Sequence, residues 1–221
     1  MEDLVTVNGI VLKHSPSGDY DWVVTIFTAE RGKITAFARG ARKTGNKLCG
    51  CVEPFCFGSF KLFASRTAYN IQEASIDNYF EGFRTDLEAA CYGTFFLELA
   101  SYYTRENNED TELLNLLYIS LKALLKDTFK NTLVRCIYEL KSLKIEGEYP
   151  GIPDEKEIPL SESARYALEY IEKSPLEKLY TFSVADNVMS ELSRVTALYR
   201  RRFIDKKLLS LEMLSSFDSE L

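Results

Sequence analysis

Apolar and polar residues alternate along much of the first third of the chain, and a period of two indicates β-strands. The clearest case is residues 32–39, in which Ile34, Ala36 and Ala38 alternate with the other side chains. Further short runs are rich in β-branched and aromatic residues and are bounded by turn residues. The predicted strands are residues 5–13, 22–28, 32–39, 55–64 and 69–76. Five short strands with little room for helices between them predict a small closed or partly closed barrel.

Beyond residue 80 the apolar positions recur every three or four residues, which is the period of an amphipathic helix. The predicted helices are residues 86–104, 112–126, 131–144, 161–173 and 183–204. Residues 146–159 contain three Pro, two Gly and five acidic residues, so they are predicted to form a loop. The pattern therefore predicts an α+β protein with a barrel domain at residues 1–80 and an all-helical C-terminal domain at residues 81–221.

The composition is that of an ordinary globular protein, with 221 residues, 46% hydrophobic and 27% charged. No apolar run approaches the roughly 18 residues needed to span a bilayer, and the acidic N-terminus lacks the features of a signal peptide. The five cysteines are odd in number and scattered, unlike a secreted disulfide framework. We therefore expect a cytoplasmic protein that does not associate with membranes.

Charge is distributed unevenly along this acidic chain, which has 27 Lys and Arg against 33 Asp and Glu. Residues 1–80 carry a net charge of +1, and residues 81–221 carry -7. Residues 31–52 contain no Asp or Glu, and the six cations within them are Arg31, Lys33, Arg39, Arg42, Lys43 and Lys47. A solvated strand and loop is the simplest interpretation, but such a stretch in an acidic protein favours a surface that binds a polyphosphate backbone. A small barrel with a basic, aromatic face is typical of an OB-fold.

We predict that this stretch contacts the backbone of a nucleic acid through Lys33, Arg39, Arg42, Lys43 and Lys47. Arg42 and Lys43 are the first candidates because the glycines at positions 40 and 45 let the chain approach a backbone closely. Contacts between these cations and phosphates release counterions, so the affinity is expected to fall steeply with salt.

One aromatic residue belongs to the same predicted surface. Lys33 and Arg39 are six residues apart, so they share one face of a strand, and Phe37 lies on that face. We expect Phe37 either to stack on a base or to pack in the core, with equal weight. Because charge and stacking treat all bases alike, little sequence preference is expected.

A second basic cluster lies at the end of the last predicted helix and comprises Arg200, Arg201, Arg202, Lys206 and Lys207. Cations near a helix C-terminus are favoured by the helix dipole alone, which is one explanation. The functional alternative is a second DNA contact or a dock for an acidic peptide tail.

No catalytic or metal-binding constellation is evident, so we expect neither an enzyme nor a cofactor. The chain has a single histidine, His14, and lacks the Ser nucleophile, phosphate-loop and dinucleotide motifs. Cys49 and Cys51, with Cys56 nearby, lack the second cysteine pair of a closed zinc site. We therefore predict no bound metal.

The order of several short motifs resembles the RecO family of recombination mediators. The residues that carry the resemblance are Gly9-Ile10-Val11-Leu12-Lys13, then Thr25, Phe27, Thr28, Gly32, Ala38, Gly40, Arg42, Lys43, Lys47, Pro54 and Phe55, then Phe83-Arg84-Thr85-Asp86-Leu87-Glu88, Glu98-Leu99, Arg135-Cys136-Ile137-Tyr138-Glu139-Leu140, Gly147 and Lys206-Lys207-Leu208-Leu209-Ser210. No single motif is highly specific, but the ordered set covers most of the chain.

The resemblance implies a non-enzymatic, nucleoid-associated protein of DNA repair and recombination. Such a protein binds single- and double-stranded DNA, anneals strands, contacts RecR and the single-strand-binding protein, and helps to load RecA. Arg135 is a candidate contact for the acidic, hydrophobic tail of the single-strand-binding protein, although an Arg on a helix surface is the more ordinary interpretation.

The chain departs from the family at one point. Many members carry a four-cysteine zinc site after the motif that corresponds to Gly147-Glu148-Tyr149-Pro150, whereas here the last cysteine is Cys136. We therefore expect a member without structural zinc. A different class also remains open, namely a protein-interaction adaptor whose OB-like module binds acidic peptides rather than DNA.

Overall fold

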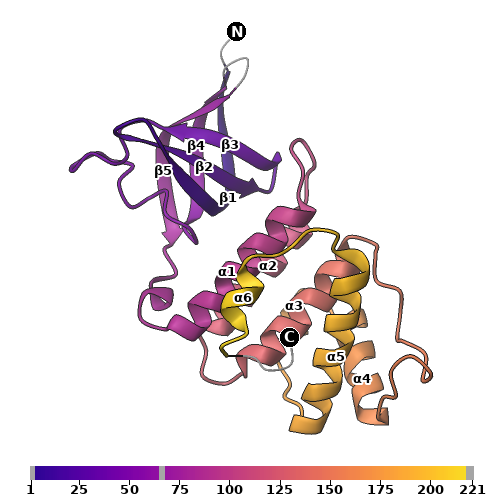
Figure 1. Cartoon of the computed structure of the whole chain (residues 1–221). Helices are drawn as coiled ribbons and strands as arrows, with labels where there is room; N and C mark the ends of the chain where they lie inside the picture. The colour runs from indigo at the N-terminus through magenta and orange to yellow at the C-terminus, as the bar shows by residue number, and fades with distance from the viewer. Residues whose placement is uncertain (1–2, 65–67, 218–221) are drawn as a thin grey trace. The chain divides into compact units, whose positions relative to one another are not determined.

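A computed structural model describes residues 3–64 and 68–217 (Figure 1). The chain forms two compact units. The barrel unit consists of Met1–Glu81 and Leu97–Leu114, and the helical unit consists of Gly82–Phe96 and Asn115–Leu221. Among the described residues, no helix combines the length and the apolar character needed to cross a lipid bilayer.

Five strands form a closed barrel in the barrel unit, which confirms the predicted OB-like architecture and the α+β class. The strands are β1 (Asp3–Ser17), β2 (Asp21–Thr28), β3 (Gly32–Ala38), β4 (Phe57–Ala64) and β5 (Tyr69–Asn78), and their order around the barrel is β1-β2-β3-β5-β4. Neighbouring strands are antiparallel except β3 and β5, which pair in parallel through Ala36–Tyr69 and Phe37–Asn70.

Strand β1 is longer than predicted, because it continues through Ser15–Ser17, a segment whose composition suggested a turn. Its first half pairs with β4 and its second half with β2, so the strand serves both neighbours in succession. A bulge between Val11 and Lys13 bends it where it passes from one partner to the other. This change of partner closes the barrel, and residue preferences alone give no signal for it.

The barrel core follows the alternation seen in the sequence. Ile34, Ala36 and Ala38 of β3 are buried, whereas Lys33, Thr35 and Phe37 face outward. The same core includes Val24, Ile26, Phe60 and Leu62 from β2 and β4. Burying each large side chain contributes about 1.5–3 kcal/mol, so this single layer supplies most of the stabilisation of so small a barrel.

A segment after α1 (Leu87–Tyr103) belongs to the barrel unit and joins the turn between β2 and β3. The backbone of Lys33 donates to the carbonyl of Arg105 at 3.1 Å, and that of Asn107 donates to Arg31 at 2.9 Å. Gly32, at φ +60°, makes this approach possible, because a Cβ there would lie 2.1 Å from the Arg105 oxygen. The glycine is therefore required both by backbone conformation and by space.

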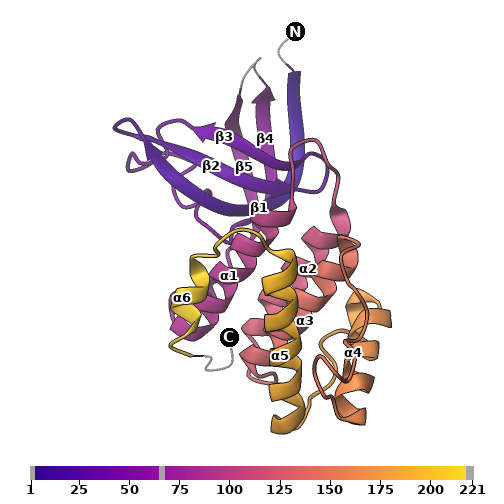
Figure 2. The same ribbon diagram turned by 45° about the vertical axis from the view of Figure 1, so that its right-hand side comes forward.

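The remaining elements are helical. They are η1 (Glu81–Arg84), α1, α2 (Thr111–Leu124), α3 (Asn131–Ile145), α4 (Glu162–Lys173), η2 (Leu176–Lys178), α5 (Asp186–Phe203) and α6 (Ser210–Leu214). The five long helices match the predicted ones to within three residues at each end, whereas periodicity missed the short α6. Helices α3, α4 and α5 pack together (Figures 1 and 2). Eleven consecutive residues of α3, 133–143, are buried, so other elements cover this helix on all sides.

Candidate nucleic-acid interface

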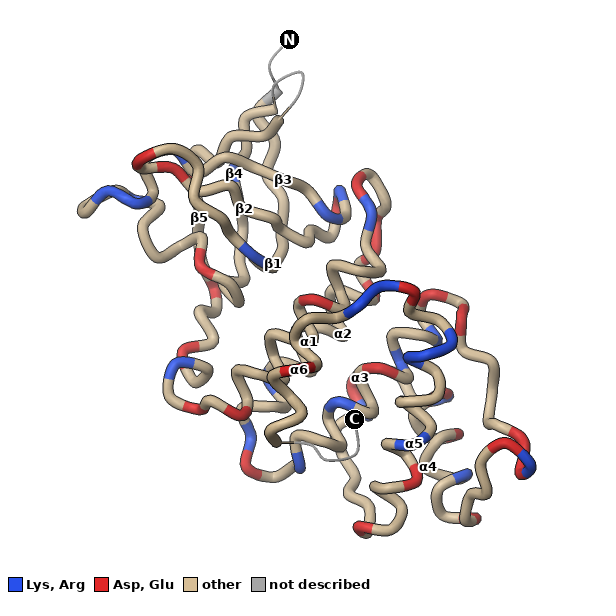
Figure 3. Tube along the Cα trace, in the orientation of Figure 1, with Lys and Arg blue, Asp and Glu red and all other residues tan. Residues whose placement is uncertain are grey.

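The segment that joins β3 to β4, residues 39–56, is the basic loop, and Figure 3 shows the cations along it. A series of turns folds it, with backbone hydrogen bonds from Lys43 to Gly40 at 2.9 Å and from Asn46 to Lys43 at 3.1 Å. Leu48 and Val52 bury their side chains in the barrel core and anchor the loop. The basic loop is therefore a folded surface whose cations have defined positions.

Arg42 and Lys43 lie over aromatic rings of the β1–β2 hairpin. The Arg42 guanidinium carbon is 5.1 Å from the centre of the Trp22 ring, and Lys43 Nζ is 4.5 Å from the centre of the Tyr20 ring. Arg42 also donates to the Gly18 carbonyl at 3.2 Å. Each exposed cation–π contact contributes about 0.5–1 kcal/mol, enough to bias the side chain without removing it from solvent.

The sequence did not single out Tyr20, although it is 52% exposed beside Lys43. Trp22 is half-buried and packs against the core, and it also stacks on His14, with ring centres 4.0 Å apart and planes 3° from parallel. The rings of His14 and Trp22 therefore form a stacked layer beneath Arg42. In the sequence, the one available indication of the contact with Lys43 was that Tyr20 lies in a predicted turn between two strands.

Arg39 and Lys47 line a cavity of about 400 Å³ between the basic loop and the outer face of β4 and β5, here called the loop cavity. Arg39 Nε donates to Asn70 Oδ1 at 3.1 Å. Lys47 Nζ lies 3.8 Å from a carboxylate oxygen of Glu73, and both side chains are well exposed, so this ion pair is weak. Phe37 lies beside Asn70 on the outward face of β3, half-buried rather than in the core.

Lys33 also faces outward from β3, but it has a different neighbour. Its ammonium group donates to the carbonyl of Ser101 in the last turn of α1. Carbonyls at a helix C-terminus have no partner within the helix, and a cation satisfies them well. Lys33 is the second residue of β3, and Arg39 follows the last residue of that strand, so about 20 Å separates Lys33 from the loop cations. The structure therefore groups Arg39, Arg42, Lys43 and Lys47 and sets Lys33 apart.

The second predicted basic cluster divides in the same way. Arg201, Arg202, Lys206 and Lys207 are exposed at the end of α5 and after it. Arg202 forms an ion pair with Glu157, and Lys207 forms one with Glu212. The fifth member is only 8% exposed, so Arg200 is a correction to the expected surface.

Arg135 is a further correction, because its side chain is fully buried rather than on a helix surface. Its guanidinium donates to Glu139 Oε1 at 2.7 Å, to Thr196 at 3.3 Å and to Ser193 at 3.2 Å. Glu139 also accepts from Arg200, at 2.9 and 3.1 Å. Two cations therefore share the Glu139 carboxylate in the Arg135–Glu139–Arg200 triad inside the helical unit. The i, i+4 spacing of Arg135 and Glu139 within an apolar helix was the available signal.

Arg200 reaches the surface at a cavity of about 720 Å³, here called the arginine cavity. Arg194 and Arg201 line it with Arg200, and its apolar lining includes Ile158 and Leu211. Cations and aliphatic side chains that share one hollow suit a ligand with both acidic and apolar groups.

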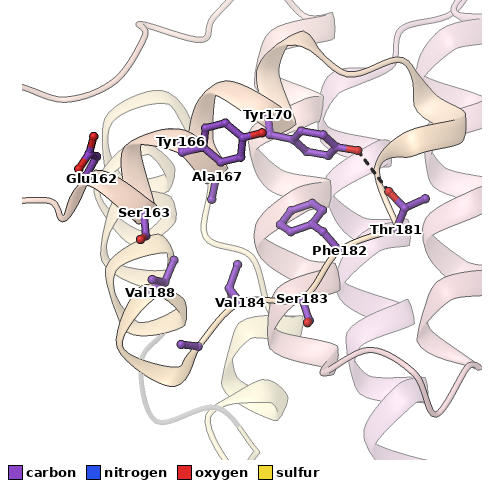
Figure 4. Close-up of a pocket in the computed structure, with 11 residues that line it drawn as sticks. Glu162, Ser163, Tyr166, Ala167, Tyr170, Thr181, Phe182, Ser183, Val184 and Val188 are labelled. Carbon is purple, nitrogen blue, oxygen red and sulfur yellow. Dashed lines mark hydrogen bonds between the residues drawn. The ribbon is translucent and has the colours of Figure 1, made fainter.

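A cavity of about 670 Å³ lies between α4 and the segment that leads into α5 (Figure 4). Tyr166, Tyr170 and Phe182 give it an aromatic lining, and the Tyr170 hydroxyl lies 3.2 Å from that of Thr181. Its one charged lining residue is Glu162. A hollow with an acid and no Lys or Arg in its lining does not suit phosphate.

All five cysteines are free thiols. Burial raises the pKa of Cys91 and of Cys136, which disfavours their thiolates. In the described part of the chain, no three His, Cys, Asp or Glu side chains gather as a metal site would require. The absence of bound metal stays a prediction.

Comparison with known proteins identifies the relatives of this chain. Residues 1–80 match the family model for the N-terminal region of recombination protein O, and residues 84–153 match the model for its C-terminal region. The chain belongs to the RecO family. The N-terminal match includes the whole basic loop. Helices α4 and α5 lie beyond the C-terminal match, as does the cavity lined by Tyr166, Tyr170 and Phe182.

Whole-chain comparisons agree with the RecO assignment. The chain is 26% identical over 241 residues to "DNA repair protein RecO" of Acetivibrio thermocellus, with 96% of each chain covered. It is 26% identical over 239 residues to the protein of that name from Clostridium perfringens strain 13, covering 96% of this chain and 97% of the relative. It is 32% identical over 149 residues to that of Alkaliphilus metalliredigens, covering 67% and 61%.

Proposed function

We propose that this RecO-family protein is a DNA-binding recombination mediator, acting in DNA repair in the cytoplasm at the nucleoid. Arg42 and Lys43, held exposed over Trp22 and Tyr20 in a stretch without acids, are the observation that carries the proposal. Arg39 and Lys47 extend the same surface. In this division of labour, residues 1–80 hold DNA and residues 81–221 contact partner proteins.

The proposed activity is annealing of single strands without a chemical step. Two strands repel each other through their phosphates, and cations at fixed positions screen that repulsion while leaving the bases free to pair. Double-stranded DNA meets the same cations through its backbone. Charge and aromatic stacking treat bases alike, so most of the surface binds with little regard to sequence.

We place the contact with the tail of the single-strand-binding protein at the arginine cavity. That tail is acidic and hydrophobic, and the cavity combines Arg194, Arg200 and Arg201 with apolar lining. Arg135 supports the site indirectly, because it donates to Glu139, which also accepts from Arg200 of the cavity lining. RecR is the other expected partner of this protein, and the two contacts together would help to load RecA on DNA coated by the single-strand-binding protein.

The test is fluorescence anisotropy of a labelled single-stranded oligonucleotide at low and moderate salt. With about five phosphates neutralised, the log–log slope should be near -3.5, so a fourfold rise in salt costs on the order of a hundredfold in affinity. The variant Arg42→Glu/Lys43→Glu should lose this binding. The matched control is Lys156→Glu/Lys178→Glu, which makes the same charge change at exposed positions of the helical unit.

Two results would overturn the proposal: no binding by the wild type at low salt, or equal losses in the test and control variants. The second candidate function, an adaptor for acidic peptides, is favoured specifically by the arginine cavity. An adaptor would bind an acidic peptide with an apolar end, lose it on Arg201→Glu, and be indifferent to Arg42→Glu/Lys43→Glu.

A further inference from the structure

The wall of the loop cavity combines an aromatic ring with an amide. Phe63 of β4 pairs directly with Asn70 of β5, and Phe37 of β3 pairs with Asn70 from the other side. All three face outward and are half-buried, so two phenyl rings flank one amide across three adjacent strands. Phe63 and Asn70 line the cavity itself. A ring next to hydrogen-bonding groups is the combination that holds a flat, polar heterocycle.

The polar groups of this wall are only partly used. Arg39 occupies Asn70 Oδ1, and the amide nitrogen of Asn70 donates to no other described residue. A register shift between Lys61 and Leu62 leaves Gln72 without a residue opposite it on β4, and such bulges redirect side chains. The Gln72 amide is exposed and makes no hydrogen bond within residues 3–64 and 68–217. Two neighbouring amides thus offer donors and an acceptor to a ligand.

The charges around the cavity fix where a backbone would run. Arg39 and Lys47 line it. The carboxylate of Glu73 lies 3.8 Å from Lys47 and 3.7 Å from Lys61, so Lys61 belongs to the same group of charges. About 400 Å³ of space accommodates a nucleobase, and a duplex cannot offer one because its bases are stacked inside the helix.

We propose that the loop cavity seats one unpaired base of a bound strand and reads its edge through Gln72 and Asn70. The inference rests on the proposed DNA binding and adds a base preference at one position. Side-chain amides match the adjacent donor and acceptor of adenine, N6 and N7, so adenine is the preferred occupant. The ring of Phe63 stacks beneath it, and Arg39 and Lys47 hold its flanking phosphates.

The experiment compares two labelled oligonucleotides of twelve nucleotides, one all thymidine and one with a single central deoxyadenosine. Wild type should bind the second about fivefold more tightly, since one good amide contact to a base edge discriminates by at least that factor. Gln72→Ala should abolish the difference, so that it binds the two oligonucleotides equally. Ser75→Ala, an exposed change on the same strand, is the control and should keep the preference.

The possible outcomes distinguish failure of the base pocket from failure of the proposed DNA binding. Equal binding of the two oligonucleotides by wild type would overturn the base pocket while leaving salt-dependent DNA binding intact. A preference that survives in Gln72→Ala, with a wild-type melting curve, would also overturn it. No binding of either oligonucleotide at low salt would remove the proposed function, and the pocket with it.

Discussion

Glu139 of α3 accepts two hydrogen bonds from the guanidinium of Arg200 on α5, with distances from Nη1 to the carboxylate oxygens of 2.9 and 3.1 Å. The pair crosses the interface between two packed helices, and Glu139 is only 4% exposed. Its second partner, Arg135, lies one helical turn earlier on α3. A buried triad of this kind is weak evidence for stability as a whole, but its members depend strongly on one another.

Replacing Glu139 by Gln should therefore lower the free energy of unfolding by about 3 kcal/mol or more, because two buried guanidinium groups lose their shared counter-charge. Urea denaturation followed by circular dichroism measures the change. Glu169→Gln is the control, since Glu169 forms an exposed i, i+4 pair with Lys173 that contributes under about 0.5 kcal/mol. Equal effects of the two substitutions would show that the triad charge is unimportant.

Lys33 and Arg39 share one face of β3 but should respond differently to mutation. Lys33→Met keeps the apolar stem and removes the donor to Ser101, so it should cost about 1–2 kcal/mol of stability and leave DNA affinity within about twofold. Arg39→Met should do the reverse, weakening DNA binding about fivefold with little loss of stability. Thermal melting and anisotropy on both variants decide the matter, and a large loss of DNA affinity in Lys33→Met would contradict the assignment.

Gly32→Ala should destabilise the barrel unit by about 2–4 kcal/mol, since the new Cβ meets the Arg105 carbonyl at 2.1 Å. Gly45→Ala is the matched control, because Gly45 also has positive φ, +82°, but nothing lies within 4 Å of its Cβ position. The control should cost only the conformational strain, about 1 kcal/mol. Similar losses of unfolding free energy for both variants in urea titrations would contradict the prediction, because they would mean that the Arg105 carbonyl moves away from the new Cβ at no cost.

Two neighbouring tyrosines in the helical unit should respond in opposite directions to loss of the hydroxyl. Tyr199 donates to the Gly151 carbonyl at 2.6 Å, so Tyr199→Phe should cost about 1 kcal/mol. The buried hydroxyl of Tyr149 has no hydrogen-bond partner among the described residues, so Tyr149→Phe should be neutral or stabilising by up to about 1 kcal/mol. Urea titration at pH 7 tests both, and destabilisation by Tyr149→Phe would reveal a partner such as a bound water.

Alkaline pH provides an independent check on Tyr199. Burial, assisted by Glu157, raises the pKa of Tyr199 from 10.0 to about 12. Its contribution to stability is therefore complete below pH 10 and is lost as the pH rises towards 12, because the unfolded chain ionises first. At pH 11 the loss from this group is about 1.4 kcal/mol. Tyr199→Phe should lose that much less stability than wild type between pH 9 and pH 11, and identical losses would contradict the shift.

Local patterns in the sequence predicted the elements of this fold, because apolar residues recur at the strand or helix period along them, although α3 is buried on all sides. The bounds of β3 and α3 differ from the predicted ones by one residue at one end. The pairing of β1 with two partners was not predictable in this way, since it depends on closure of the barrel by distant strands. Short α6 also escaped prediction, because five residues are too few to show a helical period.

The candidate site was predicted only in part. Arg39, Arg42, Lys43 and Lys47 are grouped as expected, because one loop carries them. Tyr20 was missed because its role depends on a hairpin folded against that loop. Arg135 and Arg200 were expected at the surface because an isolated Arg is normally exposed. Both are buried beside the carboxylate of Glu139, which for Arg200 comes from another helix.

The join between β3 and β5 has a kinetic consequence. Two residue pairs close the described barrel there, whereas the other neighbouring strands pair along most of their lengths. The barrel should open locally at this short join, and the amide hydrogens there should exchange with solvent before those of the rest of the sheet. Phe37 and Asn70 form one of its two pairs, and Asn70 also lines the loop cavity, so a strand of DNA bound there should slow this opening.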